Sequence, residues 1–140
     1  MSLTDVNWLA IIASAVIVMA LGFLWYGPLF GKQWATAMGW QSLSADEVKA
    51  KQAEATPGYI ASVIGALLTA YALSVLLTGV ADRSWMNGAG LGALVWLGMM
   101  APPALTGAIF QDTDKNVFWL NTGYQLLYML VLGAMLAVWI

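Results

Sequence analysis

The chain alternates long uncharged runs with short charged segments. Its five basic and seven acidic side chains leave four uninterrupted uncharged runs, at residues 6–31, 55–81, 84–111 and 116–140. Each run exceeds the roughly 20 apolar residues with which a helix crosses the hydrocarbon core of a bilayer. The pattern therefore predicts four membrane-spanning helices in a single domain of residues 1–140, at about 8–26, 59–80, 86–110 and 117–140.

Short connections between successive crossings make neighbouring helices antiparallel, so we expect an all-α, integral membrane four-helix bundle. Pro28 should stop or kink the first crossing at Gly27, and the segment 29–34 is then expected to be an interfacial turn. The one sizeable polar stretch follows. It contains a capping box that starts at Ser44, succeeded by good helix formers, which predicts a short amphipathic helix over about 45–55 in the first long loop.

Composition supports the membrane assignment and narrows the chemistry. Hydrophobic residues make up 61% of the chain and charged residues 9%, whereas a soluble domain needs roughly a quarter of its residues charged. Cysteine and histidine are absent, which excludes disulfides and the usual zinc ligands. The loop from Asp112 starts like a calcium loop but has Val117 and Gly123 at the sixth and twelfth positions. We therefore expect no metal and no cofactor.

Charged side chains are confined to the termini and connections. General acid–base and nucleophilic catalysis need a positioned titratable group, and the predicted crossings contain no Asp, Glu, Lys, Arg, His or Cys. Ion-coupled transport commonly depends on an intramembrane carboxylate, which is also missing. The net charge of −2 gives no indication of nucleic-acid binding. We expect a protein that is not an enzyme and has no nucleic-acid partner.

Small side chains mark the surfaces where membrane helices approach each other closely. The second crossing repeats a small residue every four positions, and the third contains a Gly-x3-Gly step. These residues are predicted to mediate helix packing, with a polar seam lining a pore as the alternative for the second crossing. The predicted packing residues are Ser62, Ala66, Ala70, Ser74, Gly88 and Gly92.

The third and fourth crossings combine a proline-induced kink with polar side chains. A proline pair should interrupt the third helix, because proline lacks the N–H that a helix requires. The fourth crossing has two amides, which need partners inside the bundle, and two tyrosines one turn apart. A ligand cavity between these two helices would involve Pro102, Trp96, Asn121, Gln125, Tyr124 and Tyr128.

Two classes of function fit these features. The favoured hypothesis is a structural or assembly protein that forms a homo-oligomer or docks on a partner in a membrane complex. The alternative is a membrane protein that binds or conducts a lipid or a small neutral solute, through the cavity between the third and fourth helices. In both cases the lipid bilayer is a partner, and a bound lipid is possible.

Lysines predict the orientation of the chain. The connections after the first and third crossings hold Lys32, Lys49, Lys51 and Lys115, whereas the other side holds only Arg83. Positively charged connections prefer the cytoplasm. We therefore expect a bacterial inner-membrane protein with both termini outside the cytoplasm.

The motif at the end of the first crossing is Tyr26-Gly27-Pro28-Leu29-Phe30-Gly31-Lys32-Gln33-Trp34. Together with the run from Gly90 to Pro102 and the pair Gly123-Tyr124, it resembles domain of unknown function 1761, a family of small bacterial and fungal membrane proteins. That family often carries a basic residue after the third crossing, where this chain has Asp112 and Asp114 beside Lys115. The resemblance implies a four-helix integral membrane fold and no particular reaction.

Overall fold

The computed structural model describes residues 2–139, and within that range it contains helices and no strand. The elements in order are α1 (Trp8–Leu24), the π turn η1 (Trp25–Leu29), α2 (Gly31–Ala37), α3 (Ala45–Glu54), α4 (Thr56–Leu77), α5 (Trp85–Val95), the π turn η2 (Trp96–Met100), α6 (Ala101–Phe110) and α7 (Lys115–Val138).

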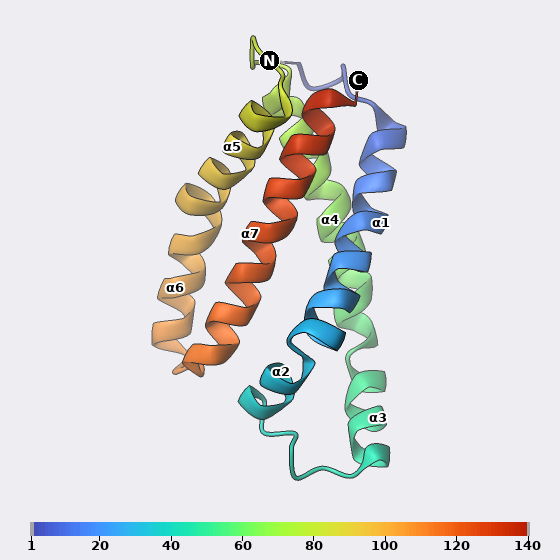
Figure 1. Cartoon of the computed structure of the whole chain (residues 1–140), viewed down its shortest axis with the longest axis vertical. Coiled ribbons are helices and arrows are strands. Elements are labelled where there is room, and N and C mark those ends of the chain that lie inside the picture. Colours follow the sequence, from blue (N-terminus) through green and yellow to red (C-terminus); the bar gives the residue numbers. More distant parts are fainter. Residues whose placement is uncertain (1, 140) are drawn as a thin grey trace.

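Four helical segments are long and apolar enough to cross a membrane, which confirms the predicted all-α four-helix fold. They are Trp8–Leu29, Thr56–Leu77, Trp85–Phe110 and Lys115–Val138. Their ends lie within a few residues of the predicted ones, and the predicted end of the last helix at Ile140 falls outside the described residues. Figure 1 shows the four running up and down in alternation.

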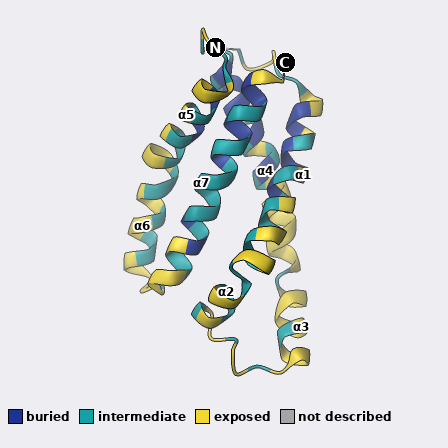
Figure 2. Cartoon of the chain, viewed as in Figure 1, coloured by how far each residue is buried: buried dark blue, intermediate teal, exposed yellow. Residues whose placement is uncertain are grey.

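The helices pack as two pairs that meet near the termini. α1 packs mainly against α4, and α5 mainly against α7. The two pairs lie close together where the N- and C-termini are, and they spread toward the end that carries α2, α3 and the α6–α7 loop (Figure 1). Buried residues gather in the half near the termini (Figure 2). The largest fully buried side chains there are Leu73, Leu77, Met129 and Leu132.

The glycines of α5 bring its backbone into contact with α7. Gly88 and Gly92 are both buried. A Cβ atom at Gly88 would collide with the carbonyl oxygen of Gly133, and one at Gly92 with the carbonyl oxygen of Met129, both well inside the 3.0 Å that real Cβ atoms keep. The Gly-x3-Gly step therefore lies against a helix of the same chain, where it allows the close approach typical of membrane helices.

The stripe of small residues on α4 is covered over only part of its length. Ala66, Ala70 and Ser74 are buried, but Ser62 is exposed. The reason is the spreading of the two helix pairs: residues 56–64 lie below the region where α4 meets its neighbours, and all of them are exposed. The periodicity of small residues continues beyond the surface that packs within the chain.

The two crossings with proline beyond their first turn, the first and the third, are each interrupted by a π turn. In the first crossing the helix continues through Gly27 and Pro28 as η1 and ends only at Leu29. In the third, the N–H of Ala101, the first residue of α6, bonds to the carbonyl of Trp96, five residues earlier, and Pro102 and Pro103 follow directly. A π turn accommodates a proline because the widened hydrogen-bond pattern tolerates the missing donor.

The segment after the first crossing differs from the interfacial turn predicted for 29–34. Only Phe30, with φ −128°, leaves helical geometry, and α2 begins directly at Gly31. The prediction was wrong because one non-helical residue is enough to redirect the chain. The predicted loop helix is confirmed as α3, whose first turn is capped by the Ser44 hydroxyl, 3.2 Å from the backbone nitrogen of Glu47.

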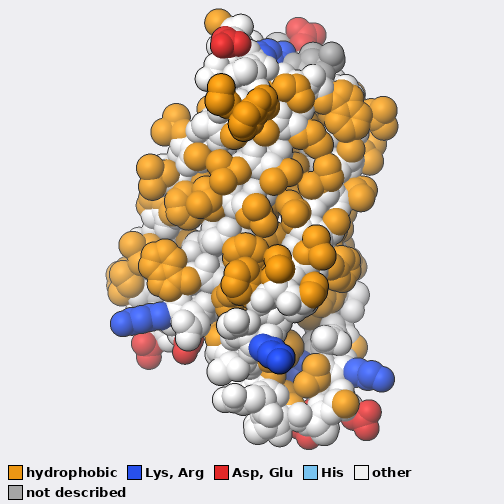
Figure 3. Space-filling view, viewed as in Figure 1, with side chains coloured by type: hydrophobic (Ala, Val, Ile, Leu, Met, Phe, Trp, Pro, Cys, Tyr) orange, Lys and Arg blue, Asp and Glu red, His pale blue; other side chains and the backbone are white. Residues whose placement is uncertain are grey.

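The outer surface has the distribution expected of a membrane protein. On the face shown in Figure 3, hydrophobic side chains form a broad belt across the middle, and the charged side chains gather at the two ends. Large apolar side chains of three crossings, Phe23, Leu68 and Met99, are more than 60% exposed. Such a surface is stable when it faces lipid chains.

Candidate ligand-binding cleft

A cleft of about 280 Å³ lies between α6 and α7, near the loop that joins them. We call it the α6–α7 cleft. It lies between the third and fourth crossings, where a cavity was predicted. Its lining comes from α6, the loop and the first half of α7, and consists of Pro103, Ala104, Gly107, Ala108, Gln111, Thr113, Phe118, Asn121, Thr122 and Gln125.

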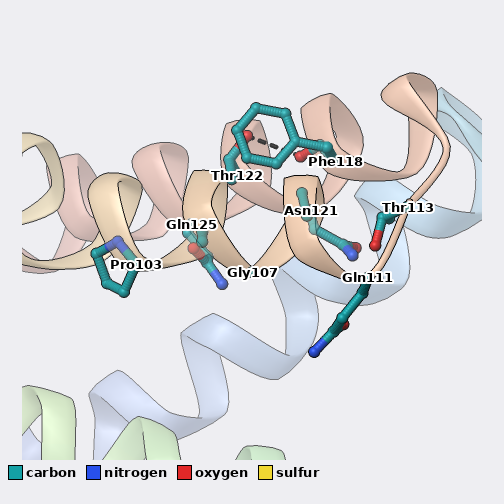
Figure 4. A pocket seen from close by; sticks show the side chains of 10 residues that line it. Pro103, Gly107, Gln111, Thr113, Phe118, Asn121, Thr122 and Gln125 are labelled. Carbon is teal, nitrogen blue, oxygen red and sulfur yellow. Dashed lines mark hydrogen bonds between the residues drawn. The ribbon is translucent and has the colours of Figure 1, made fainter.

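Three carboxamide side chains dominate the polar part of this cleft. Asn121 and Gln125 are four residues apart and therefore lie on the same face of α7. Gln111 follows the end of α6 and projects to the same side as both (Figure 4). A carboxamide carries a two-hydrogen donor and an acceptor oxygen. The row can therefore donate to and accept from one bound molecule.

Most of this hydrogen-bonding capacity is uncommitted. Asn121 accepts through Oδ1 from the Tyr26 hydroxyl at 2.7 Å, and its Nδ2 group has no partner among residues 2–139. Within the same part of the chain, the side chains of Gln111 and Gln125 make no hydrogen bond, and their amide atoms are not sealed in the interior. Thr122 is different, because its hydroxyl donates to the Phe118 carbonyl at 2.8 Å (Figure 4).

The predicted aromatic ligand contacts have another role. The Tyr124 hydroxyl donates to the Val18 carbonyl at 2.6 Å, and the Tyr128 ring packs edge-on against Tyr124 with 5.1 Å between centroids. Tyr124 thereby joins α7 to α1, and Tyr128 packs against the hydrophobic core. Neither tyrosine is among the residues that line the cleft.

Trp96 and Pro102 also lie outside the lining. The Trp96 indole N–H donates to the Thr122 carbonyl at 3.0 Å, which attaches the π turn η2 to α7. Pro102 is exposed, and its neighbour Pro103 lines the cleft instead. Of the six residues expected at this site, only Asn121 and Gln125 are in it.

The motif from Tyr26 to Trp34 covers most of η1 and the start of α2, and α2 packs against α7. The Tyr26 ring packs edge-on against both Trp34, at 4.8 Å between centroids, and Tyr124, at 5.4 Å. Gly27 and Pro28 are exposed within η1, and Gly31 begins α2 beside the Tyr26 carbonyl. Lys32 is exposed. The motif therefore positions the tyrosine that holds Asn121.

Charge is missing from the cleft surface. None of the lining residues is acidic or basic, although Asp112 and Asp114 stand in the same loop. The π turn η2 joins the α6 wall to α7, because its first residue, Trp96, donates to the Thr122 carbonyl on α7. The site is a fixed, uncharged surface of hydrogen-bonding groups open to one end of the bundle.

These features define a multi-pass helical membrane protein with a polar cleft at one end. Residues 9–137 match the family model described as a protein of unknown function, DUF1761, and the chain belongs to that family. The match covers nearly the whole chain, and it agrees with the resemblance seen in the motif from Tyr26 to Trp34. Comparison with curated proteins and with solved structures gave no match.

Proposed function

We propose that this protein binds a small, uncharged, hydrogen-bonding molecule, or the polar end of a membrane lipid, in the α6–α7 cleft. The observation that carries the proposal is the row of three carboxamides, Gln111, Asn121 and Gln125, whose hydrogen-bonding groups are largely free. The proposed role is binding or conduction, and it is supported by a lining that holds no carboxylate, amine, imidazole or thiol.

The depth of the cleft favours a ligand that enters from the membrane edge. Gln125 lies ten residues after the first residue of α7, about 15 Å along the helix axis. This is about half the thickness of a bilayer's hydrocarbon core. Polar groups at that depth have no bulk water to hydrogen-bond with. A molecule with donors and acceptors of its own is therefore stabilised there.

The test is native mass spectrometry of the full chain purified in mild detergent. The expected result is a retained small molecule or lipid on the wild type and one bound molecule fewer per chain in Gln125→Leu, a change of similar size that removes only hydrogen-bonding groups. Gln52→Leu, on the exposed helix α3, is the matched control and should leave retention unchanged. Equal retention in wild type and Gln125→Leu would contradict the proposal.

Assembly is the second candidate, and it is favoured by the exposed half of α4. Gly88 and Gly92 are covered by α7 and are not free to contact another chain. A contact between chains would instead use residues of α4 such as Gly58, Ser62 and Gly65. A Cβ atom added at Gly58 or Gly65 would have no atom from elsewhere in the described residues 2–139 within 4 Å. A homo-oligomer or a membrane-protein partner could approach closely there.

Copy number tests the assembly hypothesis. The wild type should form particles with more than one chain in mild detergent, and Gly65→Leu should reduce them to single chains by adding bulk to the contact. Gly98→Leu is a matched control, since Gly98 also has open space around it but lies on η2. Single chains in the wild type would exclude assembly with itself.

We also propose that the chain resides in a bacterial inner membrane with both termini outside the cytoplasm. Lys32 lies in α2, Lys49 and Lys51 in α3, and Lys115 at the start of α7. These segments are at the end of the bundle opposite the termini (Figure 1), which supports this orientation. Because the chain has no cysteine, Thr4→Cys and Ser42→Cys each introduce a single reactive site. A membrane-impermeant maleimide should label the first and not the second in intact spheroplasts; the reverse pattern would overturn the orientation.

A further inference from the structure

A second and larger cleft of about 650 Å³ lies between the start of α7 and the segment formed by η1 and α2. We call it the α2–α7 cleft. It shares no lining residue with the α6–α7 cleft, and its lining consists of Trp25, Phe30, Lys32, Gln33, Thr36, Asn116, Trp119, Leu120 and Gly123.

The two clefts lie on nearly opposite faces of α7. Each residue of an α-helix turns about 100° from the one before it. By this measure, Asn121 and Gln125 point to one face, and Trp119 and Gly123 point roughly 160° away. Tyr124 lies between the two faces and bonds to α1, so it separates the clefts. The α2–α7 cleft is therefore an independent site.

One part of this cleft is an apolar wall, which the packing of Trp25 creates. The Trp25 indole N–H donates to the Leu120 carbonyl at 3.0 Å, and its ring packs against Phe30 at 4.5 Å between centroids. Gly123 makes this approach possible, since a Cβ there would come within 3.2 Å of the Trp25 ring. The wall is thus a fixed aromatic surface.

Polar groups form the other part of the lining. Lys32 provides the one charged side chain among the lining residues, and Gln33, Thr36 and Asn116 provide uncharged donors. The nearby carboxylate of Asp114 does not line the cleft, and it accepts a hydrogen bond from the Asn116 backbone at 2.8 Å as the cap of α7. The one charge in the lining is therefore positive, which suits an anion.

The cleft is at the membrane edge. Lys32 follows the first crossing, which ends at Leu29, by three residues, and Trp119 is 66% exposed near the start of the last crossing. Tryptophan and lysine at the ends of crossings lie at the depth of lipid headgroups. A basic pocket between membrane helices at this depth is suited to an acidic headgroup.

We propose that the α2–α7 cleft binds an anionic phospholipid, with its phosphate at Lys32 and its glycerol and upper acyl chain against Trp25, Phe30 and Trp119. The lipid fits better than free phosphate, because free phosphate has no group to cover the aromatic wall. The lipid's phosphate accepts from the Lys32 ammonium and from the neighbouring amide and hydroxyl groups, while its apolar part leaves the cleft toward the belt seen in Figure 3.

The test compares two lipids on the purified full chain. Phosphatidylglycerol and phosphatidylcholine are added in turn at equal concentration in mild detergent, and the lipid adducts are counted by native mass spectrometry. The wild type should retain phosphatidylglycerol preferentially. Lys32→Gln should lower that retention about fivefold, the effect of about one lysine at a membrane surface, and leave phosphatidylcholine unchanged. Lys32 is exposed and makes no hydrogen bond among residues 2–139, so the variant should fold normally.

Lys115→Gln is the matched control, because it removes the same charge from the same end of the bundle but outside the cleft. It should keep the preference for phosphatidylglycerol. Added inorganic phosphate should leave the lipid adducts in place. Equal retention of both lipids by the wild type, an equal effect of the two lysine variants, or displacement by inorganic phosphate would each overturn the proposal.

Discussion

The contact between α5 and α7 makes a sharp prediction about single methyl groups. Gly92→Ala places a Cβ against the Met129 carbonyl, whereas Gly90→Ala, two residues away on the same helix, places one in open space. Both changes gain the helix propensity of alanine, about 1 kcal/mol. Only Gly92→Ala also overpacks the contact between the helices, which lowers the free energy of unfolding by about 1–3 kcal/mol.

The free energies of unfolding of the two variants should therefore differ by about 1–3 kcal/mol, with Gly92→Ala the less stable. The measurement is reversible unfolding in mixed detergent micelles on titration with sodium dodecyl sulfate, followed by circular dichroism. Gly88→Ala should behave like Gly92→Ala, because its Cβ would meet the Gly133 carbonyl. A difference below about 0.5 kcal/mol, the size of an ordinary surface substitution, would refute the close backbone contact.

Three other predictions concern hydrogen bonds between and within helices. Tyr124→Phe removes the bond to the Val18 carbonyl and should lower the free energy of unfolding by about 0.6–2 kcal/mol in the same titration. Trp96→Phe removes the bond to the Thr122 carbonyl and should increase amide hydrogen exchange in η2 while exchange in α4 stays unchanged. Ser44→Ala removes the cap of α3 and should reduce the helicity of that segment, at a cost of about 1 kcal/mol, without changing the four crossings.

The four crossings could be predicted from sequence because charge is so strongly excluded from the bilayer core. The distribution of twelve charged residues sets the limits of the helices, while the exact ends depend on local capping, such as that of α7 by Asp114. The packing of Gly88 and Gly92 followed from the close approach that glycine allows. Its partner, α7 of the same chain, could not be read from one sequence.

The candidate site was less predictable. Asn121 and Gln125 were recognisable because an amide inside a crossing needs a partner. Gln111 and Thr113 could not be recognised as residues of the cleft from the sequence, because polar residues are common in any connection between helices. Tyr124 was expected in the same cleft as Gln125, but the two residues point to different faces of α7, and only the position of α1 decides which face is covered.

The π turn η2 has a consequence for the register of the third crossing. A π turn is equivalent to one extra residue inserted into an α-helix, so everything after it is rotated by about 100°. The face that α6 presents to α7, with Pro103 and Gly107, is determined by that single additional residue. Wound as a regular α-helix without the π turn, the same residues would turn this face about 100° away from α7, so the cleft depends on the widened turn at Trp96–Met100.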